Sequence, residues 1–329
     1  MSHLGIVIPA AGEGQRLRPH TLVRPKVMLE VAGKPIIGHI VDRLKELKPE
    51  VICVVVPPHD RTIKDYLQAN FSLNFEFVVQ PLPKGLADAV LCAEAAIRNL
   101  PMLVLLGDTI LDVDLKALLN EESAIGVKEV ADPRRFGVVK LQDGFVREVI
   151  EKPLQPVSNL AIVGVYFFAE PGPVFAALHR LIREKRMVKN EFQFTDALQI
   201  MADAGRKIKP IEIANWYDCG TPQALIETNR ALLKALGRQG VAVSGEHSLL
   251  IFPVHIARDA VIENSIIGPF VSVSSGARII NSVVADALVY ENAVIEKAVV
   301  SQGIVGENAE VRGKGEMVNI GPGERVVLG

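Results

Sequence analysis

The stretch PAAGEGQRLRPHTLVRPKVMLEVAGKP, residues 9–35, decides the fold of the first part of the chain. It directly follows the apolar run LGIVI, residues 4–8, which is typical of a buried strand. The stretch then supplies Gly12, Gly14, Arg16 and Lys26. A glycine-rich turn after a first strand lets backbone N–H groups approach phosphates, and nearby arginine and lysine side chains neutralise them. The stretch therefore predicts a site that grips a nucleoside triphosphate.

Two common phosphate-binding motifs do not fit this stretch. Leu17 stands where a dinucleotide-binding fingerprint has its third glycine, and the G-K-[ST] of a P-loop is missing. A simple strand-to-helix turn would also account for two glycines spaced in this way. The two glycines alone therefore do not identify the kind of site, and the longer motif around them is needed.

That longer string resembles the signature of the sugar-1-phosphate nucleotidylyltransferases, and among them most closely the glucose-1-phosphate thymidylyltransferases. The signature reads G-x-G-x-R-L-x-P-x-T, then P-K-x-M-L, then G-K-P. The matching residues are Gly12, Gly14, Arg16, Leu17, Pro19, Thr21, Pro25, Lys26, Met28, Leu29, Gly33, Lys34 and Pro35. The opening P-A-A-G, which contains Ala10 and Ala11, is also similar to the P-x-A-G of uridylyltransferases. The resemblance covers about residues 4 to 235.

Composition limits the classes of partner and compartment. The 329 residues favour two domains, and 36 Lys+Arg against 38 Asp+Glu give a net charge of −2, which indicates neither a nucleic-acid nor a membrane surface. Cys53, Cys92 and Cys219 form no metal-binding spacing and fit a reducing compartment. We find no pattern typical of a signal peptide or a membrane-spanning helix. A cytoplasmic location is expected.

Apolar runs alternate with helical patterns through the first 220 residues or so. Strands are predicted over 51–56, 75–79 and 102–106, and helical spacing is found over 86–100. Continuous apolar strands separated by amphipathic helices predict an α/β fold with a Rossmann-like mixed sheet. Ligands then bind beyond the carboxyl ends of the strands. Gly12, Gln80 and Asp108 fall at such ends.

The pattern changes near residue 240. Helical spacing stops after Leu236, and the segments 247–262, 263–279, 280–295 and 296–311 align as repeats of 16 or 17 residues. Aliphatic residues recur every five or six positions, which predicts a β-solenoid with three faces. The repeats resemble the hexapeptide repeats of left-handed parallel β-helices. We therefore expect a nucleotidyltransferase domain over 1–237 and a short left-handed β-helix over 238–329, with residues 312–329 as a cap.

Two carboxylates are the candidate metal ligands. Asp108 follows a buried strand in LVLLGDTILD, and Asp218 lies in NWYDCGTP. A turn or helix-capping role is the ordinary alternative for both. The resemblance implies that Asp108 and Asp218 share Mg²⁺, and that Trp216, in W-x-D-x-G-T, faces the sugar. Thr109 stands where thymidylyltransferases often have asparagine.

Other segments match the sugar and base sites that the resemblance implies. Glu151-Lys152-Pro153 matches its E-K-P, with Lys152 on the sugar phosphate and Glu151 on sugar hydroxyls. Gly137 in RRFGVVK and Val163 in AIVGVYFF resemble its other sugar-facing segments. Gln80 and Gly85 match Q-x-x-x-x-G-L-A, which recognises a pyrimidine base. A glutamine amide can pair with one base edge, although a polar loop would also explain these residues.

The implied reaction joins dTTP or UTP to a sugar 1-phosphate, with glucose 1-phosphate preferred. The sugar phosphate attacks the α-phosphorus and pyrophosphate leaves. Arg16 would hold the leaving group, Lys26 would neutralise phosphate charge, and Ala10, Ala11, Gly12 and Gly14 would contact the nucleotide. Two alternatives stay open: a catalytically silent regulatory subunit that binds sugar nucleotides, and a hexapeptide-repeat acyltransferase. A homo-oligomer is expected, because a short solenoid exposes strand edges at its ends.

Overall fold

The chain divides into two compact units. The computed structural model describes residues 3–111, 115–155, 157–188, 190–237 and 247–313. The first unit is formed by residues 1–29 and 34–225, and the second by Glu30–Gly33 together with residues 226–329. The division falls inside helix α8 (Pro222–Leu236), whose end at Leu236 agrees with the end of the helical pattern. A functional boundary at residue 237 stays a prediction.

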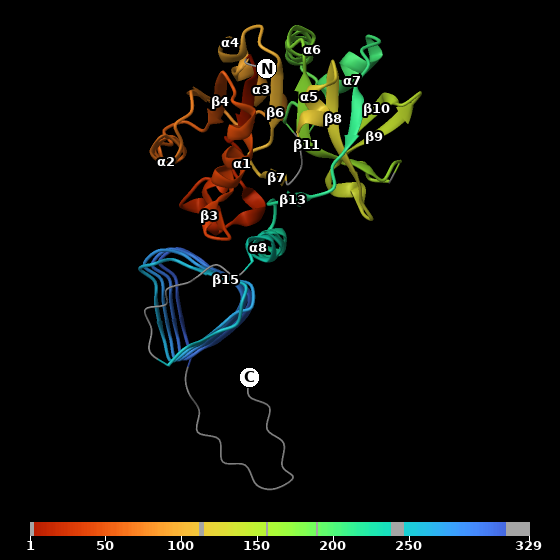
Figure 1. The fold of residues 1–329 in the computed structure, drawn as a ribbon. Coiled ribbons are helices and arrows are strands. Elements are labelled where there is room, and N and C mark those ends of the chain that lie inside the picture. The colour runs from red at the N-terminus through yellow and green to blue at the C-terminus, as the bar shows by residue number, and fades with distance from the viewer. Residues whose placement is uncertain (1–2, 112–114, 156, 189, 238–246, 314–329) are drawn as a thin grey trace. The chain divides into compact units, whose positions relative to one another are not determined.

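The first unit is built on a mixed sheet of nine strands among the described residues (Figure 1). Its main path runs β10-β9-β11-β6-β1-β4-β5, with β8 beside β11 and β12 beside β8. Strands β6, β1, β4 and β5 run parallel, whereas β11 is antiparallel to β6 and to β8. The bounds are β1 (Gly5–Pro9), β4 (Val51–Val56), β5 (Phe75–Val79), β6 (Met102–Leu105), β8 (Ser123–Glu129), β9 (Gly137–Gln142), β10 (Phe145–Glu151), β11 (Leu160–Phe168) and β12 (Lys209–Glu212). The predicted Rossmann-like mixed sheet is confirmed.

Helices and short turns connect these strands. The helices are α1 (Ile36–Leu44), α2 (Thr62–Asn70), α3 (Leu86–Cys92), α4 (Glu94–Ile97), α5 (Lys116–Leu119), α6 (Gly172–Arg183) and α7 (Phe194–Asp203). The 3₁₀ turns are η1 (Gln15–Leu17), η2 (His20–Leu22), η3 (Lys26–Met28), η4 (Lys45–Leu47) and η5 (Pro133–Arg135). Four short strands are β2 (Glu30–Val31), β3 (Lys34–Pro35), β7 (Thr109–Leu111) and β13 (Trp216–Asp218).

The helical pattern over 86–100 forms two helices rather than one. The backbone N–H of Ala93 donates to the carbonyl of Val90 at 3.1 Å, a tight bond that interrupts the regular helix between α3 and α4. Helices α3, α6 and α7 contribute to one buried apolar cluster with the sheet, in which Phe168 and Phe194 are among the largest buried side chains. In the described part of the chain, no helix has both the length and the apolar character needed to span a bilayer.

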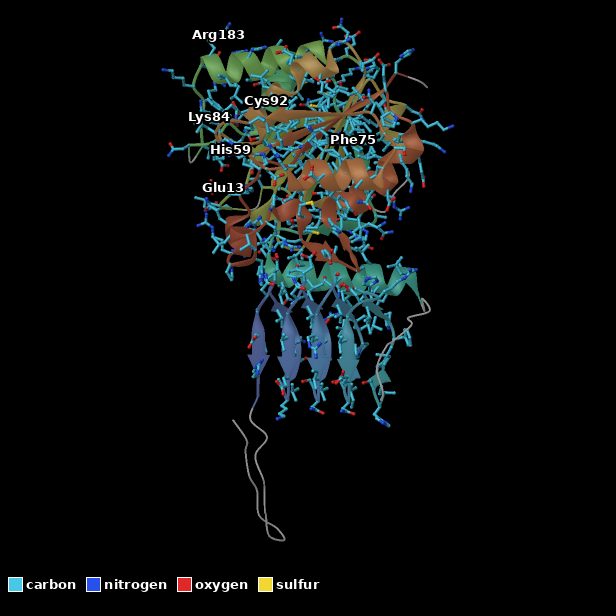
Figure 2. All side chains as sticks on the ribbon, turned by 90° about the vertical axis from the view of Figure 1, so that its left-hand side faces the viewer. Glu13, His59, Phe75, Lys84, Cys92 and Arg183 are labelled. Carbon is cyan, nitrogen blue, oxygen red and sulfur yellow. The ribbon has the colours of Figure 1, made fainter. Side chains whose placement is uncertain are left out.

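The second unit contains a β-helix of parallel strands. Figure 1 shows it along its axis as a triangle, and Figure 2 shows the strands of successive coils side by side. Two described sheets carry these strands, one built on β14, β15, β17, β18, β20 and β22 and the other on β16, β19, β21 and β23. The bounds are β14 (Leu249–Leu250), β15 (Val254–Ile256), β16 (Val261–Glu263), β17 (Ile266–Ile267), β18 (Val271–Val273), β19 (Arg278–Ile280), β20 (Val283–Val289), β21 (Val294–Glu296), β22 (Val299–Val305) and β23 (Glu310–Arg312).

The register of these strands agrees with the repeat read from the sequence. Leu249 pairs with Ile266, and Val283 with Val299, so partners in neighbouring coils stand 17 and then 16 positions apart. The recurring aliphatic residues, from Ile256 to Val311, pack into one apolar cluster inside the coils. The β-helix is therefore confirmed, while its left-handedness stays a prediction. The cap expected from residues 312–329 lies almost entirely outside the described residues.

One face of the β-helix carries a column of exposed aliphatic side chains. It consists of Leu249, Ile266, Val283 and Val299, which follow one another in register from coil to coil. The next residue in each of the last three coils points inward, since Ile267 and Val284 are fully buried and Val300 is half-buried. Apolar side chains aligned in this way on a surface are typical of an interaction site.

Glu30–Gly33 belongs to the second unit because polar groups of the β-helix and α8 hold it. The Asn229 side chain is fully buried, and its Oδ1 accepts from the Ala32 backbone N–H at 2.9 Å and from Ser272 Oγ at 2.6 Å. Ser274 Oγ donates to the Glu30 carboxylate. The buried side chains of Asn229, Ser272 and Ser274 thus all have hydrogen-bond partners, as buried polar groups in stable proteins generally do.

Candidate functional site

The glycine-rich loop that follows β1 packs directly against Lys26. Gly14 adopts a left-handed conformation with φ 62°, and a Cβ there would lie 2.9 Å from Thr21 Cγ2 and 3.1 Å from Lys26 Cβ. Only glycine allows both the conformation and the approach. Thr21 Oγ1 also donates to the Gly14 carbonyl at 2.9 Å, which closes the loop. The sequence G-x-G-x-R thus folds the loop back so that Lys26 lies beside it.

Lys26 and Asp108 form a partly buried ion pair. The Lys26 Nζ donates to Asp108 Oδ2, and only 10% of the Lys26 side chain is exposed. Burial alone would raise the pKa of Asp108, but the Lys26 charge and its hydrogen bond outweigh burial and hold that pKa below its ordinary value. Asp108 is therefore an ionised carboxylate at neutral pH.

The backbone sets Asp218 beside Asp108. Strands β7 and β13 run antiparallel with Asp218 opposite Thr109, and the Cys219 N–H donates to the Asp108 carbonyl at 3.0 Å. Burial raises the pKa of Asp218, and the negative charge of Asp108 raises it further. Two residues separated by 110 positions thus form one pair of carboxylates that repel each other, which the charge of a bound cation would relieve.

Arginine side chains surround this pair. Arg135 Nη2 donates to Asp218 Oδ2 at 3.1 Å. Arg16 lies against Gly220, where a Cβ would be 2.8 Å from Arg16 Nη2. The Arg16 charge favours the ionised form of both aspartates, but burial still leaves the pKa of Asp218 raised. With Lys26, these groups place three cations around two carboxylates. Guanidinium and ammonium groups gathered at one place suit an anionic ligand such as a polyphosphate.

A first pocket of about 470 Å³ opens beside the glycine-rich loop. Nine of the predicted site residues line it: Ala10, Ala11, Gly12, Gly14, Arg16, Lys26, Gln80, Gly85 and Asp108. The resemblance implies that the first eight contact the nucleoside triphosphate and that Asp108 is one of the two metal ligands. The structure brings them together, and their roles stay predictions.

The amide of Gln80 is held in one orientation. Its Nε2 donates to the Gly85 carbonyl at 3.1 Å and to Asp88 Oδ2 at 2.8 Å, both of which can only accept. Gly85 has φ 99°, and a Cβ there would lie 2.5 Å from the Phe192 carbonyl oxygen, so glycine is required at this position. Gln80 Oε1 is the atom of this amide that is left to accept a hydrogen bond from a ligand.

A second pocket of about 240 Å³ adjoins the first and shares Arg16 and Asp108 with it. It is also lined by the predicted residues Gly137, Glu151, Lys152, Val163, Trp216 and Asp218. Val163 reaches it from a bulge in β11, where the register with β8 shifts between Ile162 and Tyr166. The predicted sugar-facing residues are therefore gathered at one place.

Polar groups in the second pocket are held in position by one another. Lys152 Nζ lies 2.7 Å from Glu151 Oε1, and Thr195 Oγ1 donates to Glu151 Oε2 at 3.1 Å. Burial raises the pKa of Tyr166, and the charges of Glu151 and Asp108 add to that shift, so the Tyr166 hydroxyl stays protonated at neutral pH. The pocket thus offers a carboxylate and an ammonium group that suit hydroxyls and a phosphate.

The two carboxylates of the second pocket fit a magnesium ion. Asp108 and Asp218 supply carboxylate oxygens, and Mg²⁺ is usually bound by one or two carboxylates together with substrate phosphates. Among the described residues, no group of three or more His, Cys, Asp or Glu side chains could hold a metal without such phosphates. Burial raises the pKa of Asp218 most, and repulsion by Asp108 adds to it; a divalent cation would remove that repulsion.

Comparison with known proteins identifies the family. A family model described as "Nucleotidyl transferase" matches residues 5–235. The chain belongs to the nucleotidyl transferase family. The match includes every predicted site residue and ends just before the end of α8. The resemblance found from the motifs is confirmed.

Relatives in this family differ in how much of their own length this chain spans. The Bifunctional protein GlmU of Methanocaldococcus jannaschii is 33% identical over 73% of the chain, which spans 59% of that protein. A glucose-1-phosphate thymidylyltransferase of Streptomyces antibioticus is 28% identical over 93% of the chain and 92% of its own length. A solved structure of UDP-glucose pyrophosphorylase complexed with UDP-glucose matches with a TM-score of 0.64 and 29% identity, over 71% of this chain and all of that one.

Sequence reasoning missed several residues that this family site contains. Asp88 holds the Gln80 amide, Thr195 holds Glu151, and Arg135 pairs with Asp218. Arg135 stands in the quoted segment RRFGVVK, yet nothing in that segment separates it from Arg134. Asp88 does carry a signal, since it lies three positions after Gly85 on a predicted helix whose start faces the same pocket.

Proposed function

We propose that the protein transfers a nucleotidyl group from UTP or dTTP to a sugar 1-phosphate, with glucose 1-phosphate as the preferred acceptor. The products are a nucleotide sugar and pyrophosphate. The observation that carries this proposal is the pair of adjoining pockets that share Arg16 and Asp108, one beside a glycine-rich loop and the other lined by Glu151 and Lys152. The names of the thymidylyltransferase relative and of the UDP-glucose pyrophosphorylase neighbour support the same substrate classes.

The reaction needs positioning and charge neutralisation rather than a covalent intermediate. An oxygen of the sugar phosphate attacks the α-phosphorus, the new P–O bond forms, and the bond to pyrophosphate breaks. Lys152 holds the attacking phosphate in the second pocket. Lys26 and Arg16 stand in the first pocket, where they neutralise the charge that moves onto the departing pyrophosphate.

We infer that the protein uses Mg²⁺ held by Asp108 and Asp218. When bound, this ion supplies charge neutralisation at the phosphate oxygens. The two carboxylates that would hold it are positioned by the pairing of β7 with β13, so they are preorganised before any substrate binds.

A pyrophosphate-release assay tests the proposed function. Purified protein is incubated with Mg²⁺, each of the common nucleoside triphosphates and a panel of sugar 1-phosphates. Turnover with UTP or dTTP and glucose 1-phosphate is expected. The panel also compares UTP with dTTP directly, which is needed because the methyl group that separates their bases typically changes binding by only about 1–3 kcal/mol. Binding of a nucleotide sugar without release of pyrophosphate from any pair would instead indicate a silent regulatory subunit.

Gln80 is expected to select the base. A uracil or thymine ring presents an N3–H donor, which Gln80 Oε1 can accept because the amide nitrogen is held by Gly85 and Asp88. Gln80→Leu removes this acceptor and leaves the N3–H of the base without a partner. We expect the KM for the pyrimidine triphosphate to rise about tenfold, with a smaller change in kcat.

The same assay carries the controls for Gln80. Asp88→Ala frees the amide to rotate, so it should weaken triphosphate binding although Asp88 itself need not touch the base. Gln68→Leu changes an exposed glutamine on α2 and should leave the KM unchanged. A normal KM in Gln80→Leu would remove the residue from base recognition.

We further propose a cytoplasmic homo-oligomer in which the exposed aliphatic column of the β-helix makes contacts. Cys53 and Cys92 are free thiols in the described part of the chain, which supports a reducing compartment. The column of Leu249, Ile266, Val283 and Val299 supports an interface between copies of the chain.

The double variant Ile266→Glu/Val283→Glu tests the assembly. It places two charges in the middle of the column, where both side chains are exposed enough for the coil to keep its inner packing. Light scattering should show fewer subunits than in the wild type, with pyrophosphate release retained. Point changes are preferable to truncation after residue 237, because truncation would remove the Ser272 and Ser274 partners of Asn229 and Glu30.

Arg278→Glu is the matched control for this test. It adds an acidic residue on β19, which belongs to the other sheet of the β-helix, so it should leave the subunit number as in the wild type. An unchanged subunit number in the double variant would rule out the column as an interface.

A further inference from the structure

The two candidate metal carboxylates are each paired with a side-chain cation, and the two pairs differ. Lys26 is buried and pairs with Asp108 beside the glycine-rich loop, whereas the Arg135 side chain is 48% exposed and reaches Asp218 from turn η5. A divalent cation that binds Asp218 competes with Arg135 for the same carboxylate oxygens. The more exposed of the two partners, Arg135, is the one that can leave its carboxylate at lower cost.

Arg135 stands where it can turn to a phosphate. It lines the second pocket together with Lys152, which the proposed function places on the sugar phosphate. Its guanidinium packs over the Phe136 ring at 5.6 Å, and this keeps the side chain at the edge of the pocket. A guanidinium presents a planar set of donors that matches two phosphate oxygens at once, which a lysine cannot do.

The neighbouring Arg134 pairs with Asp132 and not with a residue of either pocket. Its Nε and Nη2 donate to the two oxygens of Asp132 at 2.8 and 2.7 Å, and it lines neither pocket. Adjacent arginines in one turn therefore have separate partners. Arg134 completes the turn, and Arg135 faces the reaction site.

We propose that Arg135 is a sugar-phosphate-binding residue that exchanges partners, pairing with Asp218 until a divalent cation takes that carboxylate and then binding the phosphate of the sugar 1-phosphate. This inference rests on the proposed function for the identity of the acceptor substrate. The exchange couples the two ligands. The cation frees Arg135 for the sugar phosphate, and the sugar phosphate, by binding Arg135, frees Asp218 for the cation. The two ligands are then expected to favour each other's binding.

The Arg135→Gln variant tests the exchange through two affinities that should move in opposite directions. Without the competing guanidinium, Mn²⁺ should bind about tenfold more tightly, as followed by the loss of its free electron paramagnetic resonance signal. Glucose 1-phosphate, titrated by calorimetry in the presence of Mg²⁺, should bind about 10- to 100-fold more weakly. If Arg135 only supported the local structure, the variant would bind both Mn²⁺ and glucose 1-phosphate more weakly. The affinity of Arg135→Gln for UTP should stay as in the wild type.

Two further variants sharpen the test. Arg135→Lys keeps the charge but loses the planar donors, so Mn²⁺ affinity should stay near the wild-type value while glucose 1-phosphate affinity falls. Arg134→Gln changes the neighbouring arginine and should alter neither affinity. Circular dichroism spectra and melting curves check that each variant is folded.

The outcomes separate this inference from the proposed function. If the wild type releases pyrophosphate and Arg135→Gln binds both Mn²⁺ and glucose 1-phosphate like the wild type, the role of Arg135 is overturned while the proposed function stands. A loss of UTP affinity in place of glucose 1-phosphate affinity would also overturn it. If the wild type neither binds a sugar 1-phosphate nor releases pyrophosphate, the proposed function fails and the role of Arg135 fails with it.

Discussion

Replacement of Asp108 or Asp218 by asparagine is expected to lower kcat roughly 100- to 1,000-fold, because a metal contributes several kcal/mol of charge stabilisation to such a reaction. Both residues line the second pocket, Asp108 also lines the first, and β7 and β13 hold the two side by side. Asparagine keeps the shape of each side chain and removes its charge. The loss is measured as Mg²⁺-dependent pyrophosphate release at saturating substrates.

The two variants should differ in stability although both lose activity. Asp108→Asn leaves Lys26 buried without its carboxylate, so its melting temperature should fall. The pKa of Asp218 is raised in the folded chain, which means that its ionisation at neutral pH opposes folding. Asp218→Asn removes that charge and should melt no lower than the wild type.

Asp65→Asn is a control for both, since Asp65 is exposed on α2 and lines neither pocket. It should match the wild type in turnover and in melting temperature. Near-normal Mg²⁺-dependent turnover in Asp108→Asn or in Asp218→Asn would refute the metal assignment for that residue.

Much of the fold could be predicted because local patterns specify it. The continuous apolar runs that became β1, β4 and β6 are buried on both faces, so nearly every position in them had to be apolar. The period of the β-helix was visible because each coil repeats the same inward position, as Ile267 and Val284 do. Patterns of this kind need no knowledge of distant contacts.

Features that depend on distant contacts could not be predicted in the same way. Glu30–Gly33 lies among residues of the signature, yet it belongs to the second unit because Asn229 and Ser274 bind it from about 200 or more positions away. The roles of Thr195 and Arg135 likewise depend on which carboxylate the fold brings near them. The motif residues that line the pockets could be found from the sequence, whereas of the residues that hold them in place only Asp88 carried a signal.

Replacement of Lys26 by alanine is expected to lower kcat about 100- to 1,000-fold while changing KM much less. This is the typical effect of removing one preorganised charged donor from a transition state. Lys26 is fixed before any ligand binds, since its side chain is buried and its Nζ is paired with Asp108. A donor that is already in place stabilises most strongly the charge that develops later, when the bond to pyrophosphate breaks.

Lys34→Ala makes the comparison specific. Lys34 lies eight positions further on in the same signature, but it pairs with Asp42 and lines neither pocket, so its loss should leave kcat unchanged. Lys26→Ala also releases Asp108 from its partner, and Mn²⁺ should then bind more tightly even though turnover falls. Tighter metal binding together with a lower kcat would show that Lys26 stabilises the phosphate charge in the transition state and does not act by helping the metal to bind. A rise in KM alone, with kcat preserved, would show instead that Lys26 only helps to bind the triphosphate in the ground state.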